Sequence, residues 1–151
     1  MKTPALCALL LLAGLGLAST AHAHCQVPCG IYGDSTKFDV LMEHVATIEK
    51  ASAQISELAT KEHPSAQDQQ QLVRWVDNKE HHAQLIIDEA ANYFLAQRIK
   101  SGAEHYSDKL TLLHEIIVYA MKSKQTTDGK AVATLGEKLS AFKALYLDHN
   151  H

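Results

Sequence analysis

Apolar residues recur at steps of three and four positions along most of the chain, from about residue 34 to residue 147. Four segments carry this pattern, which is typical of amphipathic helices with one buried face. Their apolar positions are Phe38, Leu41, Val45, Ile48, Ile55 and Leu58 in the first; Leu72, Trp75, Val76, Ala83, Ile86, Ala90, Tyr93 and Phe94 in the second; Tyr106, Leu110, Leu113, Ile116, Ile117 and Ala120 in the third; and Val132, Leu135, Leu139, Phe142, Leu145 and Tyr146 in the fourth. Strand-like alternation is absent from the sequence. The pattern predicts an all-α fold, an antiparallel up-down-up-down four-helix bundle with short links.

The residues between these segments are those that start and stop helices. Residues 33–35, Gly-Asp-Ser, give turn and N-cap chemistry before the first helix. Pro64 ends that helix, because proline restricts the preceding residue and cannot continue the hydrogen-bond ladder. Either Ser65 or Asp68 can cap the second helix, and the polar residues 123–129 separate the third helix from the fourth.

The N-terminal residues 1–23 have the layout of a secretory signal peptide. Lys2 supplies a positive charge, and an apolar run of 14 residues follows from Ala5 to Ala18. This run is shorter than the roughly 20 residues that a membrane-spanning helix needs. Ala21-His22-Ala23 matches the small-x-small pattern before a cleavage site. We therefore expect cleavage after Ala23 and a periplasmic or secreted protein with no membrane association after signal removal.

Composition narrows the function classes. Hydrophobic residues make up 46% of the chain and aromatic residues 6%, which suits a globular helical domain. After loss of Lys2 the chain holds 13 basic and 17 acidic residues, a net charge of about −4. Nucleic-acid partners are not expected, since they require a basic face. The predicted mature chain keeps only two cysteines, Cys25 and Cys29.

The usual metal sites of helical bundles are missing from the sequence. No glutamate is followed by histidine three positions later, as a di-iron bundle requires, and no C-x-x-C-H run marks a c-type haem. His81 and His82 are neighbours that diverge by about 100° on a helix, so they do not easily share one metal. His44, His105 and His114 are interpreted as isolated surface histidines, and Met42 and Met121 as core fillers. The helices are therefore expected to act as a scaffold.

Residues 24–32, HCQVPCGIY, hold the candidate chemistry. Cleavage after Ala23 would turn the amide nitrogen of His24 into an α-amine, which can bind a metal. This amine, the backbone nitrogen of Cys25 and the Cys25 thiolate can form two fused five-membered rings on one metal. A turn at Pro28 allows Cys29 to add a second thiolate, with the His24 imidazole as an axial ligand. Square-planar sites of this kind suit Ni(II) or Cu(II) rather than tetrahedral zinc.

This stretch resembles the nickel-hook signature of nickel-containing superoxide dismutases, H-C-x-x-P-C-G-x-Y. The six fixed positions of the signature match His24, Cys25, Pro28, Cys29, Gly30 and Tyr32. The length and helical pattern of the rest of the chain are also similar to the family.

The resemblance implies an enzyme that disproportionates superoxide to dioxygen and hydrogen peroxide while nickel cycles between Ni(II) and Ni(III). It implies that His24 gives its amine and imidazole, Cys25 its amide nitrogen and thiolate, and Cys29 its thiolate. Catalytic roles fall on His24 and on Tyr32, which positions small anions and water. The family also implies a homohexamer of four-helix bundles. The chain would then comprise a cleaved signal (1–23), a nickel hook (24–32) and a bundle domain (33–151).

Some family features have no clear counterpart in the motif. Gln26 stands where some members carry aspartate, so a carboxylate role there is in doubt. The carboxylate and the basic residue that hold the axial imidazole are candidates only, drawn from Asp39, Glu43, Arg74 and Lys79. Two further side chains are candidates near the site: Tyr93, which is more readily a core aromatic, and Lys37, which could steer superoxide or simply be a solvated lysine.

Two other readings remain open from the residues. The same hook could serve an exported metal carrier or sensor for nickel or copper, or Cys25 and Cys29 could form a disulfide, as exported proteins often do. A nine-residue hook with little apolar content should be disordered without metal and ordered by it.

Overall fold

The computed structural model describes residues 33–148, which form four α-helices and one π-helical segment and contain no strand. The elements are α2 (Asp34–Ala59), α3 (Ala66–Asp88), the π-helix η1 (Glu89–Arg98), α4 (Tyr106–Gln125) and α5 (Gly129–Leu147). The all-α prediction is confirmed over this range. The predicted signal peptide and hook lie outside the described residues.

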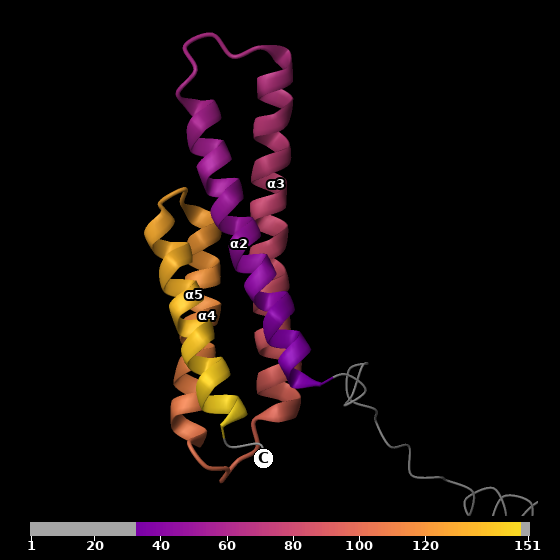
Figure 1. The fold of residues 1–151 in the computed structure, drawn as a ribbon, viewed down its shortest axis with the longest axis vertical. Coiled ribbons are helices and arrows are strands. Elements are labelled where there is room, and N and C mark those ends of the chain that lie inside the picture. Colours follow the sequence, from indigo (N-terminus) through magenta and orange to yellow (C-terminus); the bar gives the residue numbers. More distant parts are fainter. Residues whose placement is uncertain (1–32, 149–151) are drawn as a thin grey trace, which may run out of the picture.

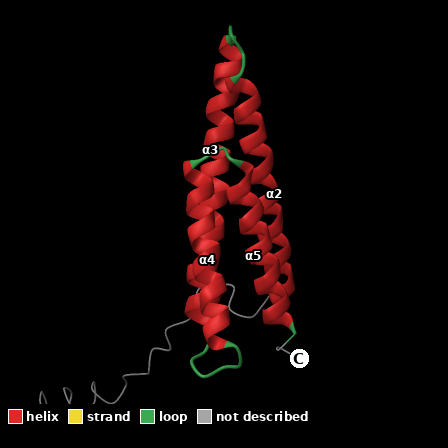
Figure 2. Cartoon of the chain, turned by 90° about the vertical axis from the view of Figure 1, so that its left-hand side faces the viewer, coloured by secondary structure: helices red, strands yellow, loops and turns green. Residues whose placement is uncertain are grey.

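The helices are arranged as a bundle in which each packs against the next along the chain, and α2 also packs against α5 (Figure 1). The α2–α3 pair is longer and rises beyond the tips of α4 and α5 (Figure 2). The loop at 60–65 lies at that protruding end, and the loop at 99–105 lies at the opposite end, near the start of α2. The first residues of α2 and the ends of η1 and α5 therefore come together. None of the helices in this part of the chain is long and apolar enough to cross a bilayer.

The predicted cap of the second helix uses both candidate residues. Ser65 is the N-cap, and its hydroxyl accepts a hydrogen bond from the Asp68 backbone nitrogen at 3.1 Å. The Asp68 carboxylate in turn accepts from the Ser65 backbone nitrogen at 2.9 Å. This reciprocal pair is a capping box, which satisfies two backbone donors that a helix start leaves unpaired. It fixes the point at which the chain re-enters the bundle after Pro64.

A cluster of aromatic rings fills the core at the end where α2 begins. Phe38 of α2, Phe94 of η1 and Phe142 of α5 are fully buried, with ring centroids 5.0 to 5.5 Å apart. Tyr146 lies one turn after Phe142, and its ring centroid is 5.6 Å from that of Phe38. Such tilted and edge-to-face contacts add to the free energy gained from burying these large side chains. The core therefore ties the first turn of α2 to η1 and α5.

Several predicted core positions are more exposed than expected. Val76, Met42 and Met121 expose 38%, 36% and 45% of their surface, so the interpretation of the two methionines as core fillers is wrong. In α4, Leu110 is half-buried while the preceding Lys109 is buried at 6% exposure.

Lys79 links the middle of α3 to the end of α4. Its ammonium donates hydrogen bonds to the backbone carbonyls of Ser123, Lys124 and Thr126 at 2.9, 2.7 and 2.9 Å. The last carbonyls of a helix have no partner within the helix and carry partial negative charge, so a cation there is favourable. Lys79 is only 4% exposed. The sequence offered Lys79 as a candidate for the basic residue near the His24 imidazole, but its ammonium donates instead to carbonyls at the end of α4.

We expect Lys79→Met to lower the free energy of unfolding by about 2–3 kcal/mol, because it leaves three buried or partly buried carbonyls without their charged donor. Equilibrium urea denaturation of the mature protein measures this loss. Lys130→Met, an exposed lysine near the same loop, is the matched control and should change stability by less than about 0.5 kcal/mol. Equal losses in the two variants would contradict the capping role of Lys79.

Candidate metal centre and the Asp34 cluster

The predicted metal ligands His24, Cys25 and Cys29, and the predicted catalytic Tyr32, lie outside the described residues. The structure describes the chain from Gly33 onward, directly after this stretch. Within residues 33–148, no group of three or more histidine, cysteine, aspartate or glutamate side chains is placed to hold a metal. The described part of the chain therefore adds no competing metal centre. Its contribution to the site comes from the residues that directly follow residue 32 in sequence.

Asp34 begins α2 and stands two residues after Tyr32. Gly33 is the N-cap, with an extended backbone, and its carbonyl accepts a hydrogen bond from the Thr36 nitrogen at 3.1 Å. A carboxylate in the first turn is favoured by the partial positive charge of a helix N-terminus. Asp34 also lies one turn before Phe38, which is fully buried. Because Phe38 is anchored in the aromatic core, the position of Asp34 at the end of the bundle is fixed.

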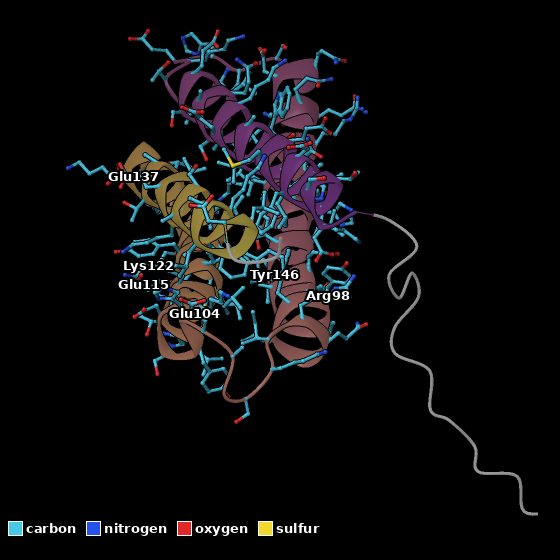
Figure 3. The ribbon with its side chains drawn as sticks, turned by 60° about the horizontal axis from the view of Figure 1, so that its bottom comes forward. Arg98, Glu104, Glu115, Lys122, Glu137 and Tyr146 are labelled. Carbon is cyan, nitrogen blue, oxygen red and sulfur yellow. The ribbon has the colours of Figure 1, made fainter. Side chains whose placement is uncertain are left out.

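The Asp34 carboxylate accepts hydrogen bonds from two other elements. Tyr146 of α5 donates to Oδ2 at 2.5 Å, and Tyr93 of η1 donates to Oδ1. Arg98, also on η1, donates from Nη2 to Asp34 Oδ1 at 3.0 Å and to the Tyr93 hydroxyl at 2.7 Å. We call these four residues the Asp34 cluster; Figure 3 views this end of the bundle and labels Arg98 and Tyr146.

Electrostatics within the Asp34 cluster favour the ionised carboxylate. Burial raises the pKa of Asp34, but the hydrogen bonds from Tyr146 and Tyr93 and the charge of Arg98 outweigh it, so the net shift is downward. Burial and the neighbouring Asp34 carboxylate raise the pKa of both tyrosines, which keeps their hydroxyls as donors. The Arg98 guanidinium also lies 4.9 Å from the centroid of the Tyr93 ring. Tyr93 is therefore both a core aromatic and a polar link to Asp34, a role that its apolar spacing did not predict.

The other side chains that the sequence offered as partners of the hook are engaged elsewhere or exposed. Lys37 forms an ion pair with Glu89 at 2.9 Å and lies 4.9 Å from the Tyr93 ring centroid, so its charge is partly offset. Asp39 pairs with Lys143 at 2.8 Å.

The other two candidates for the imidazole carboxylate and its basic partner are on the outside of the long helices. Glu43 is exposed on α2. Arg74 is exposed on α3, where it lines a groove of about 470 Å³ together with Trp75 and His81.

His44 and His82 form a pair between α2 and α3. Their Nδ1 atoms are 2.9 Å apart and their ring centroids 4.9 Å apart, so one imidazole donates to the other. The interpretation of His44 as an isolated histidine is wrong. Burial lowers the pKa of both rings; His82 adds to the effect on His44, and His81 adds to the effect on each. The pairing spans 38 positions of sequence and cannot be read from helical spacing.

Comparison with known proteins places the chain in a class. The model of nickel-containing superoxide dismutases matches residues 19–150, which includes the predicted hook and all described helices. Among curated proteins and solved structures, no match to this chain is found.

The chain therefore belongs to the nickel-containing superoxide dismutase family. It is an oxidoreductase with a nickel cofactor and superoxide as substrate.

The Asp34 cluster predicts a specific loss of stability. Asp34→Asn removes the charge that two tyrosines and Arg98 recognise, and we expect a loss of about 1–3 kcal/mol in the free energy of unfolding at pH 7. Because the folded pKa of Asp34 lies below 3.8, its contribution is present above that pH and is lost as pH falls through the folded value. The variant should therefore show a flatter loss of stability in acid.

Asp39→Asn is the matched control for this experiment, since Asp39 is an exposed aspartate of the same helix with one ion pair. Urea denaturation between pH 7 and pH 3 compares the two variants with the parent. A change for Asp34→Asn no larger than that for Asp39→Asn would refute the importance of the cluster.

The histidine pair predicts a second pH effect, at higher pH. Because the folded pKa values of His44 and His82 lie below 6.5, the unfolded chain binds protons more readily, and stability decreases as pH falls below about 6.5. His44→Gln should flatten this decrease between pH 7.5 and pH 5.5, as measured by chemical denaturation. His114→Gln, at an exposed position of α4, should leave the profile unchanged.

Proposed function

We propose that the protein is exported, is cut after Ala23, and disproportionates superoxide at a nickel hook formed by residues 24–32. The carrying observation is that the family match spans residues 19–150 and so includes a stretch in which all six fixed positions of the hook signature are present. The signal-like residues 1–23 support a periplasmic or secreted location, because they end where the hook requires a free amine.

The donor set fits nickel by its chemistry. His24 would supply its α-amine and imidazole, Cys25 its backbone nitrogen and thiolate, and Cys29 its thiolate. Such a set of nitrogen and thiolate donors would hold nickel, which accepts both kinds of ligand. Nickel bound there would supply the one-electron Ni(II)/Ni(III) couple on which both halves of the dismutation depend.

The residues of the chain have separate tasks in this proposal. The His24 amine exists only after cleavage, so export and maturation precede activity. Thiolate, not thiol, binds metal, so Cys25 and Cys29 must lose their protons. Tyr32 would place superoxide and water beside the metal through its hydroxyl. Asp34, two residues later, would hold the end of the hook on the bundle.

The bundle is proposed as a scaffold of up-down-up-down topology within a homohexamer. Support for the topology comes from the loops at 60–65 and 99–105, which lie at opposite ends of the helices (Figure 1). Support for assembly comes from apolar residues on the outer face of the described helices: Val73 of α3 exposes 59% of its surface and Val40 of α2 exposes 42%. Uncovered apolar side chains of this kind are common where subunits meet.

The alternative of a metal carrier or sensor uses the same hook with nickel or copper and no turnover. The family match favours the enzyme. The disulfide alternative leaves the histidine at the cleavage site without a purpose. A thiol count on the metal-free protein separates it from the open dithiol that nickel needs.

The hook is tested by keeping the backbone nitrogen of His24 as an amide, which prevents it from binding the metal as an amine. We expect the mature protein that begins at His24 to bind one nickel per chain and to consume superoxide. A variant with one extra alanine before His24 should lose activity by at least about 100-fold, because its histidine nitrogen stays an amide. Cys29→Ser should lose activity to a similar extent.

Metal analysis and superoxide decay measured by pulse radiolysis give the readouts, and N-terminal sequencing of the exported protein checks the cleavage site. His63→Gln, an exposed histidine in the loop at 60–65, is the control and should keep activity. Full activity in the alanine-extended form would refute the hook.

A further inference from the structure

A pocket of about 350 Å³ opens at the end of the bundle next to the Asp34 cluster. Its walls come from the start of α2, the end of η1, the loop at 99–105, α4 and α5. We call it the end pocket, and its charged and polar lining consists of Asp34, Gln97, Arg98, Lys100, Lys109 and Tyr146. Asp34 belongs both to this lining and to the chain segment that directly follows the hook.

The lining of the end pocket is rich in positive charge. Three of the side chains that line it are cations, and Asp34 is its one carboxylate. That carboxylate already accepts hydrogen bonds from Arg98 and from both tyrosines of the Asp34 cluster. No ion pair joins Lys100 or Lys109 to any residue within 33–148. The pocket thus keeps an excess of positive charge in a chain whose overall charge is negative.

Lys109 is the most unusual of these cations. The residue as a whole is 6% exposed and lines the pocket, and its ammonium lies 5.9 Å from the centroid of the Tyr146 ring. Among the described residues this ammonium has no hydrogen-bond or ion-pair partner. Partial burial of an ammonium with no opposite charge beside it is unfavourable, and an anion in the pocket would offset that cost. A second donor of the same lining, Arg98 Nε, is buried and has no partner in this part of the chain. A buried donor without a partner, beside a cation with no opposite charge, points to an ion or water bound in the pocket.

We propose that the end pocket binds small inorganic anions and concentrates superoxide beside the hook. The inference about superoxide rests on the proposed function, whereas anion binding by the pocket does not. Lysine ammonium groups act as point charges that hold anions without demanding one geometry, which suits a small diatomic anion. A local positive field raises the rate at which a charged substrate arrives, even where the net charge of the protein repels it.

Thermal denaturation of the mature protein in inorganic phosphate tests anion binding. Phosphate should raise the Tm by about 3 °C or more at ten times its Kd, relative to sodium chloride of equal ionic strength. Lys109→Met keeps a side chain of similar length and removes the charge, so this rise should disappear. Lys122→Met, at an exposed position of the same helix, should retain it. A rise that is absent in the parent, or equal in Lys109→Met, would overturn the site.

Superoxide decay at low ionic strength tests the kinetic role. Lys109→Met and Lys100→Gln should each lower the second-order rate constant by about 2- to 5-fold and weaken its dependence on salt, with nickel content unchanged. Lys100 is exposed, so its substitution keeps the test valid if Lys109→Met folds poorly. An unchanged rate and salt dependence in both variants would overturn the steering. If the parent protein shows no dismutase activity, the proposed function fails, while the phosphate experiment still decides whether the pocket binds anions.

Discussion

The hydrogen bonds to one carboxylate, that of Asp34, join three elements of the bundle at the end where the chain leaves the hook. Tyr146 brings in α5, and Tyr93 and Arg98 bring in η1. An ionised carboxylate that accepts from phenols and a guanidinium is strongly held, because charge-assisted hydrogen bonds are shorter and stronger than neutral ones. Since the aromatic core lies one turn further along α2, the position of residue 34 is fixed from both sides. The described chain therefore begins, directly after residues 24–32 in sequence, at a firmly held first turn of α2.

The helices could be predicted from the sequence because the spacing of apolar residues within one helix indicates which of its faces is buried. The recurrence of Phe38, Leu41, Val45 and Ile48 predicted α2, and these four residues are buried. The burial of the lysines could not be predicted in the same way, because the groups that surround them belong to other helices. Lys79 is inside the protein because α4 ends beside it with unpaired carbonyls.

The candidate site also has one part that the sequence predicts and one part that it does not. The hook is predicted from a local motif whose spacing carries its chemistry, and it stays a prediction because residues 24–32 lie outside the described part of the chain. The surroundings are not local: Asp34 meets Tyr146 across 112 positions of sequence, and His44 meets His82 across 38. Periodicity placed Tyr93 correctly in the core, but it gave no sign of its hydroxyl bond to Asp34. Contacts of this kind arise from how helices meet, and single-helix patterns do not contain them.

In this protein the placement of charged side chains matters more for an anionic substrate than the net charge does. A net charge of −3 should repel superoxide, and the lysine nearest the predicted hook in sequence, Lys37, is offset by Glu89. The bundle nevertheless gathers Arg98, Lys100 and Lys109 around one pocket whose only carboxylate is already engaged. At physiological salt a charge is felt over roughly 8 Å, so the lining of this pocket acts on an approaching anion more than the distant acidic surface does. An acidic protein can in this way serve an anionic substrate, provided that cations gather where the anion approaches.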